Sequence, residues 1–130
     1  NEAGFVGHVY GSGGAPGLGT HGSMSRQEMR CVLIARGPSF KRGVTIDSPS
    51  GNIDIAPTIL EILGYDGGES MDGRVLEEAL VSGSGAVESS TETHAAERKL
   101  SSGVFLQQVT LSTVGQTVYV DEGNAEFISA

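Results

Sequence analysis

The clearest periodic pattern of hydrophobic positions in the chain is helical and covers residues 54–64. Asp54 is a good N-cap residue, and Pro57 falls in the first turn, where its missing N–H costs no hydrogen bond. Gly64 stands where a left-handed residue commonly ends a helix. We therefore predict a helix with one buried apolar stripe. The stripe consists of Ile55, Ile59, Leu60, Ile62 and Leu63.

A continuous apolar run, "CVLIA" at residues 31–35, precedes this helix and is closed by Gly37 and Pro38. Such a run is typical of a strand that is buried on both faces of a sheet. We expect Cys31, at its start, to be a buried and unreactive thiol. Ser25 and Glu28 have the spacing of a capping box, so a short helical turn is expected just before the run.

The pattern changes after residue 80. Residues 81–97 are rich in Ser, Gly, Thr and Glu, which predicts a flexible linker. Two β-type segments, "GVFLQQVTLS" and "QTVYVDEG", follow on either side of "TVG" and predict a hairpin. The expected organisation is an α/β region at 1–80, a linker at 81–97 and a β-rich tail at 98–130.

Charge and composition narrow the classes of partner. The chain has 130 residues and a net charge of −8, which argues against a nucleic-acid-binding patch or an anionic membrane surface. No apolar run reaches the length of a membrane span, so no membrane segment is expected. Its single cysteine excludes a disulfide within the chain.

Candidate chemistry centres on the glycine-rich stretch at residues 11–22, which contains His21. The stretch lacks the spacing of a phosphate-binding loop. On local chemistry alone, His21 is either part of a flexible turn or one metal ligand, and both interpretations stay open, because a zinc site needs three or four ligands. The nearby acids have structural explanations: Asp54 as a helix cap, Asp72 as a turn residue, and Glu77 and Glu78 as an exposed helical face. No complete active site is evident, and we assign no catalytic residue.

Four signals recur in order along residues 17–80: "GTHG", the apolar run ending in "ARGPSF", "NIDIAPT" and "MDGR". Together they resemble the C-terminal part of the catalytic domain of type I phosphodiesterases/nucleotide pyrophosphatases, in the alkaline phosphatase superfamily. Residues 98–124 are similar to a β tail that follows this domain in some relatives, a less specific likeness.

The resemblance implies a three-layer α/β sandwich and two zinc ions that assist hydrolysis of phosphodiester or nucleotide pyrophosphate bonds by a Thr or Ser nucleophile. It assigns His21 as one zinc ligand. The family's nucleophile and other ligands precede the matching region, and residues 1–18 do not contain them. The resemblance therefore suggests a C-terminal fragment of a hydrolase acting on small phosphodiester or nucleotide substrates, inactive by itself.

Two alternatives remain open: a stand-alone, non-enzymatic α/β interaction module, and the same fold acting on sulfate esters or phosphonates. The family is often secreted or periplasmic, although no residue of this chain indicates a compartment. A sheet that lacks neighbouring strands would expose an edge, so we also expect a tendency to self-associate through it.

Overall fold

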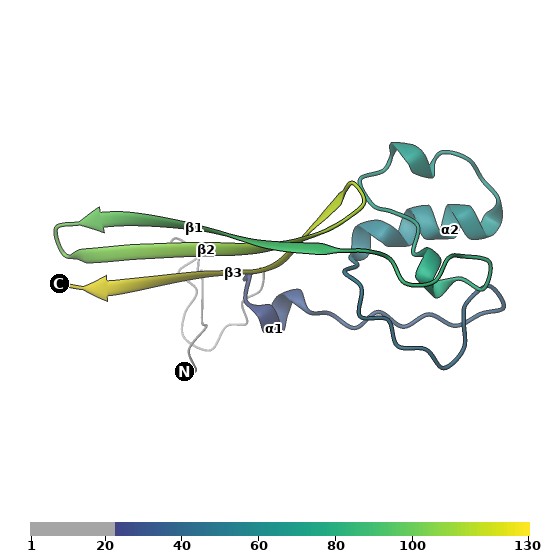
Figure 1. Cartoon of the computed structure of the whole chain (residues 1–130), viewed down its shortest axis with the longest axis horizontal. Helices are drawn as coiled ribbons and strands as arrows, with labels where there is room; N and C mark the ends of the chain where they lie inside the picture. The colour runs from purple at the N-terminus through teal and green to yellow at the C-terminus, as the bar shows by residue number, and fades with distance from the viewer. Residues whose placement is uncertain (1–22) are drawn as a thin grey trace, which may run out of the picture. The chain divides into compact units, whose positions relative to one another are not determined.

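The computed structural model describes residues 23–130, which combine short helices with a three-stranded antiparallel sheet (Figure 1). These residues form two compact units. One contains the described residues up to Val32 together with Thr91–Leu111 and Val120–Ala130, and the other contains Leu33–Ser90 and Ser112–Tyr119. The mixed helix and strand content agrees with the α/β expectation at this level. The helical elements in chain order are α1 (Arg26–Met29), η1 (Asn52–Asp54), α2 (Ile55–Leu63), η2 (Gly68–Ser70) and η3 (Glu77–Ala79), and the strands are β1 (Ser90–Leu100), β2 (Gly103–Val114) and β3 (Thr117–Ser129).

The sheet has the order β1-β2-β3, and two-residue turns connect its strands. Turns this short join only antiparallel neighbours. Gly115 opens the second turn with a φ of 60°, the positive value that the first position of a type II′ turn requires. The hairpin predicted from "GVFLQQVTLS" and "QTVYVDEG" is therefore confirmed as β2 and β3.

Strand β1 begins at Ser90, so residues 90–97, for which the sequence predicts a linker, form a strand instead. All eleven of its residues are exposed. Because neither face is buried, β1 needs no alternation of apolar and polar residues, and its composition is that of a polar loop. Pairing with β2 holds β1 as a strand. The hydroxyls of Thr93 and Thr110, for example, lie 3.1 Å apart across the two strands.

Helix α2 occupies the predicted segment and ends as expected at Gly64, which has a φ of 68°. The sequence predicts that Ile55, Ile59 and Leu63 are buried. This prediction is wrong, because their side chains are exposed. Helix α2 packs on η1 and η2. The side chains that this packing buries are Pro57 and Thr58.

The apolar run at 31–35 forms neither a helix nor a strand, so the expected buried strand is not present there. Val32 and Ile34 are 84% and 83% exposed. Cys31 is exposed as well, so the prediction of a buried thiol is wrong. An apolar run becomes a strand only where a neighbouring strand offers backbone partners, and the described residues offer none at this point.

Candidate functional site

A buried carboxylate, Asp54, lies at the centre of a hydrogen-bond network among the described residues. Its side chain has no exposed surface. The Gly51 N–H donates to Oδ2 at 2.8 Å, and the Arg74 N–H donates to Oδ1 at 2.9 Å. The Tyr119 hydroxyl lies 3.0 Å from Oδ2 and 3.2 Å from Oδ1. These donors compensate for the loss of hydration that burial of a carboxylate requires.

The prediction that Asp54 caps α2 is correct in position only. Asp54 precedes the first residue of α2, but its side chain makes no capping hydrogen bond to that helix. It closes the preceding turn, η1, through Gly51, and it binds the backbone of a segment 20 residues away at Arg74. Asp54 therefore joins two segments rather than ending one.

Arg74 is the second member of this network and pairs with Glu78 in a two-pronged geometry. Its Nη2 lies 2.6 Å from Oε1 of Glu78, and its Nη1 lies 2.9 Å from Oε2. Nη2 also donates to the Pro49 carbonyl at 2.9 Å, and Nε donates to the Tyr119 hydroxyl at 3.0 Å. Glu78 is buried, so its predicted place on an exposed helical face is wrong, whereas Glu77 is exposed as expected. We call Asp54, Arg74, Glu78 and Tyr119 the polar core.

The environment fixes the charges of the polar core. Burial raises the pKa of Glu78, but hydrogen bonds from Arg74 and the backbone, with the charges of Arg74 and Lys41, outweigh it and leave the pKa lowered. Burial is the largest cause that raises the pKa of Tyr119 to about 12, and its hydrogen bond to Asp54 adds to the rise. The hydrogen bond with Glu78 raises the pKa of Arg74 further above its usual value. At neutral pH the core thus holds a fixed ion pair and a neutral phenol.

Close backbone packing accompanies these hydrogen bonds. A Cβ on Gly73 would lie 2.1 Å from the carbonyl oxygen of Ile53, so only glycine fits there. The Thr58 hydroxyl accepts the Leu76 N–H at 3.0 Å. The segments "NIDIAPT" and "MDGR" are therefore interlocked through Asp54, Thr58 and Gly73.

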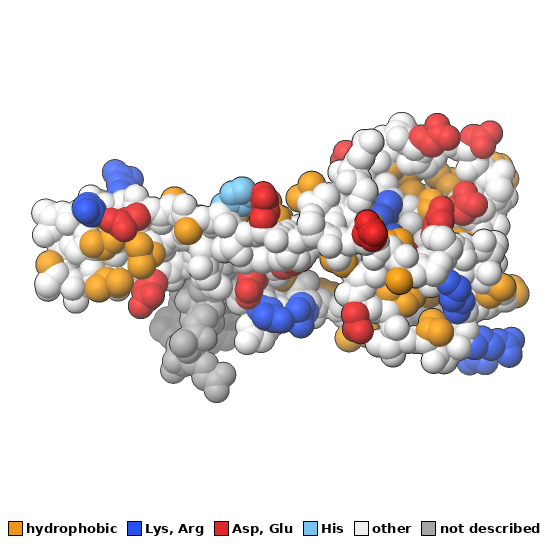
Figure 2. Space-filling view, in the orientation of Figure 1, with side chains coloured by type: hydrophobic (Ala, Val, Ile, Leu, Met, Phe, Trp, Pro, Cys, Tyr) orange, Lys and Arg blue, Asp and Glu red, His pale blue; other side chains and the backbone are white. Residues whose placement is uncertain are grey.

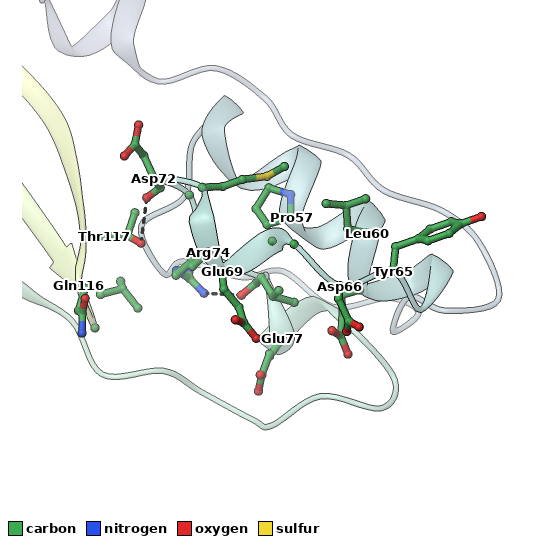
Figure 3. Close-up of a pocket in the computed structure, with 18 of the residues that line it drawn as sticks. Pro57, Leu60, Tyr65, Asp66, Glu69, Asp72, Arg74, Glu77, Gln116 and Thr117 are labelled. Carbon is green, nitrogen blue, oxygen red and sulfur yellow. Dashed lines mark hydrogen bonds between the residues drawn. The ribbon is translucent and has the colours of Figure 1, made fainter.

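A cavity of about 700 Å³ lies beside the polar core, within the unit formed by Leu33–Ser90 and Ser112–Tyr119 (Figure 3). Pro57 and Leu60 of α2 and Thr117 of the β2–β3 hairpin contribute to its lining. The acidic lining residues are Glu61, Asp66, Glu69, Asp72 and Glu77. Arg74 is the basic residue in the lining, and its guanidinium is bound by Glu78 and Tyr119. The cavity is therefore unsuited to hold a phosphate group by itself.

His21, the predicted zinc ligand, lies outside the described residues. Within residues 23–130, no group of three or more His, Cys, Asp or Glu side chains could hold a metal ion. His94 is described, and it lies exposed on β1 with Nε2 hydrogen-bonded to Glu92. This observation concerns residues 23–130 alone, and we derive no reaction step through a zinc ion.

Sequence reasoning missed Tyr119 and the pairing of Arg74 with Glu78. The pair has a recognisable signal, since opposite charges four residues apart are often close together in a helical turn. Tyr119 has no such signal, because it lies 65 residues after Asp54 on a strand. The contact depends on how the β2–β3 hairpin tip meets the 51–54 turn within the same unit.

No helix among the described residues is both long and apolar enough to span a bilayer. Comparison of the chain with models of known protein families gives no match, and none of the solved structures matches it.

Proposed function

We propose that this chain is the C-terminal part of a zinc-dependent hydrolase that cleaves phosphodiester or nucleotide pyrophosphate bonds. In this proposal the chain completes one side of a three-layer α/β sandwich. His21 provides one ligand to a two-zinc centre, and the nucleophile and remaining ligands belong to other parts of the enzyme. The substrate is a small phosphodiester or nucleotide.

The observation that carries the proposal is the contact between two of the four ordered motifs. Twelve residues separate "NIDIAPT", which ends at Thr58, from "MDGR", which begins at Met71, yet both contribute to the polar core. Asp54 binds the Arg74 backbone, and Gly73 packs directly on Ile53. Motifs that recur in order and also interlock favour a common structural origin over a chance similarity of short segments.

The exposed apolar residues support the same proposal. Val32 and Ile34 of the apolar run, and Ile59 and Leu63 of α2, are exposed to solvent in this chain. A sandwich with neighbouring strands and a covering layer would bury both sets, as the hydrophobic effect favours. Figure 2 shows hydrophobic side chains at the surface of the molecule.

The test uses the complete enzyme that carries this segment, with His21→Ala as the variant. We expect loss of one of the two zinc ions and a fall of roughly 100-fold or more in hydrolysis of a chromogenic phosphodiester. His94→Ala is the matched control, because His94 is exposed on β1, and it should retain both zinc ions and full turnover. Full zinc content and unchanged turnover in His21→Ala would refute the assignment. Parallel assays with sulfate esters and phosphonates identify the substrate class.

A non-enzymatic interaction module is the second candidate, and one observation favours it. The polar core is complete within the chain, since each of its buried side chains finds its partners there. The coding sequence upstream of Asn1 separates the two candidates. A reading frame that continues with D-x-x-x-H and a Thr or Ser nucleophile supports the hydrolase, and a start codon immediately before Asn1 supports the module.

A further inference from the structure

Strand β1 is an exposed edge of the sheet. It is the first strand in the order β1-β2-β3, and all of its residues, Ser90–Leu100, are exposed. An edge strand directs every second pair of backbone N–H and C=O groups away from the sheet, where they can pair with another strand. At eleven residues, β1 is about twice the usual length of a strand. This makes it a long template for strand addition.

The opposite edge of the sheet is partly covered. On β3, the Gly123 N–H donates to the Met24 carbonyl at 2.7 Å. Gly123 is buried, and a Cβ there would lie 3.0 Å from the end of the Met24 side chain. The segment that contains Met24 thus covers the middle of β3. Of the two edges, β1 is the one better placed to accept a further strand.

The charge pattern of β1 is complementary to itself. A symmetric antiparallel pair has its two-fold axis perpendicular to the sheet, so residue 95 of one copy faces residue 95 of the other when Ser90–Leu100 overlaps in full. In that register Glu92 lies opposite Arg98, and by symmetry the pair occurs twice. Opposite charges that face each other across strands are stabilising. Figure 2 shows acidic and basic side chains exposed along the strands.

We propose that β1 pairs with β1 of a second copy of this chain in this register. The two three-stranded sheets then form one continuous sheet across the two-fold axis. Ala95, at the centre, is small enough to let the strands approach, and Glu92–Arg98 pairs fix the register on both sides. This interaction surface is independent of the proposed hydrolase function.

Disulfide trapping tests the register directly. In a Cys31→Ser background, which removes the exposed native thiol, Ala95→Cys places two thiols opposite each other. Cα atoms in opposite positions are about 4.5–5.5 Å apart, within the range of a disulfide. Ala96→Cys is the matched control, because two copies of residue 96 would lie diagonally, about 7–8 Å apart. We expect a covalent dimer under mild oxidation for Ala95→Cys and little or none for Ala96→Cys.

Charge exchange tests the pairs that set the register. We expect Glu92→Arg or Arg98→Glu alone to weaken dimerisation about tenfold, since each creates two like-charge contacts. The double variant Glu92→Arg/Arg98→Glu should return the dissociation constant, measured by analytical ultracentrifugation, to within about threefold of the original. Both positions are exposed on one strand, so circular dichroism should show an unchanged fold. A monomeric chain, equal cross-linking at 95 and 96, or no recovery in the double variant would each overturn the proposal.

Discussion

The polar core and the apolar run at 31–35 behave in opposite ways, although both belong to motifs of the same resemblance. The core carries two acids and an arginine; both acids are buried, and no buried side-chain nitrogen or oxygen among the described residues lacks a hydrogen-bond partner. The run is composed of residues that favour the interior of a protein, and it is exposed. Chemical character alone would predict the reverse.

The contrast shows that burial depends on available partners as much as on hydrophobicity. Asp54 finds its donors on Gly51, Arg74 and Tyr119 within one compact unit. Val32 and Ile34 require the faces and edges of neighbouring strands, which the described residues do not place beside them. A polar group with three matched donors is therefore better accommodated in this chain than an apolar side chain with no surface to cover it.

Removal of the Asp54 carboxylate should have the largest effect. Asp54→Ala leaves the Gly51 and Arg74 N–H groups and the Tyr119 hydroxyl without their acceptor in a buried site. We expect the free energy of unfolding to fall by about 3–5 kcal/mol, measured by urea denaturation. Asp66→Ala, at an exposed loop position, is the control and should cost under about 0.5 kcal/mol. Similar losses in the two variants would show that the core contributes no special stability.

A smaller effect is expected at Tyr119, together with a pH dependence. Tyr119→Phe removes a donor to Asp54 and an acceptor for Arg74 Nε, and it should cost about 1–2 kcal/mol at pH 7. The pKa of Tyr119 is raised from 10.0 to about 12, so the folded state favours the neutral phenol. Its contribution is fully present below about pH 10 and is lost as the pH rises through 12.

Urea denaturation between about pH 8 and 12 measures this loss, because the pKa values of Tyr119 in the unfolded and folded states lie in this range. In Tyr119→Phe the alkaline decline should be shallower than in the unmodified chain. Tyr65→Phe is the matched control, because Tyr65 is exposed, and it should change neither the stability nor its pH profile. An equally steep decline in Tyr119→Phe would exclude Tyr119 as its source.

The smallest effect should come from the apolar run. Val32→Ser and Ile34→Ser remove side chains that are already in water, so each should change the stability of this chain by less than about 0.5 kcal/mol. Leu80→Ala, at a position 2% exposed, should cost about 2–5 kcal/mol. In the complete hydrolase that we propose, Ile34→Ser should become costly. A large loss in the present chain would mean that the run is buried in solution.

Parts of the fold could be predicted from the sequence because their signals are local. The proline in the first turn of α2, the glycine that ends α2, and the Gly115 turn between β2 and β3 act within a few residues of themselves. Strand β1 could not be predicted, since an exposed edge strand carries no apolar alternation. The apolar run predicts a strand because its sequence suits a buried sheet, but strand formation also needs a neighbouring strand.

The sequence indicates individual residues of the candidate site but not that they form one cluster. The sequence explains Asp54, Asp72, Glu77 and Glu78 each by its own turn or helix. The function of Asp54 and Glu78 as members of a shared core depends on Arg74 and on the distant Tyr119. Hydrogen-bond partners so far apart leave no spacing pattern in the sequence.

The separation of 65 residues between Asp54 and Tyr119 also orders events during synthesis of the chain. Asp54, Arg74 and Glu78 leave the ribosome well before the hairpin that carries Tyr119. Until then Asp54 cannot receive the hydrogen bond from Tyr119. We therefore expect the core to close late, when the β2–β3 hairpin has formed.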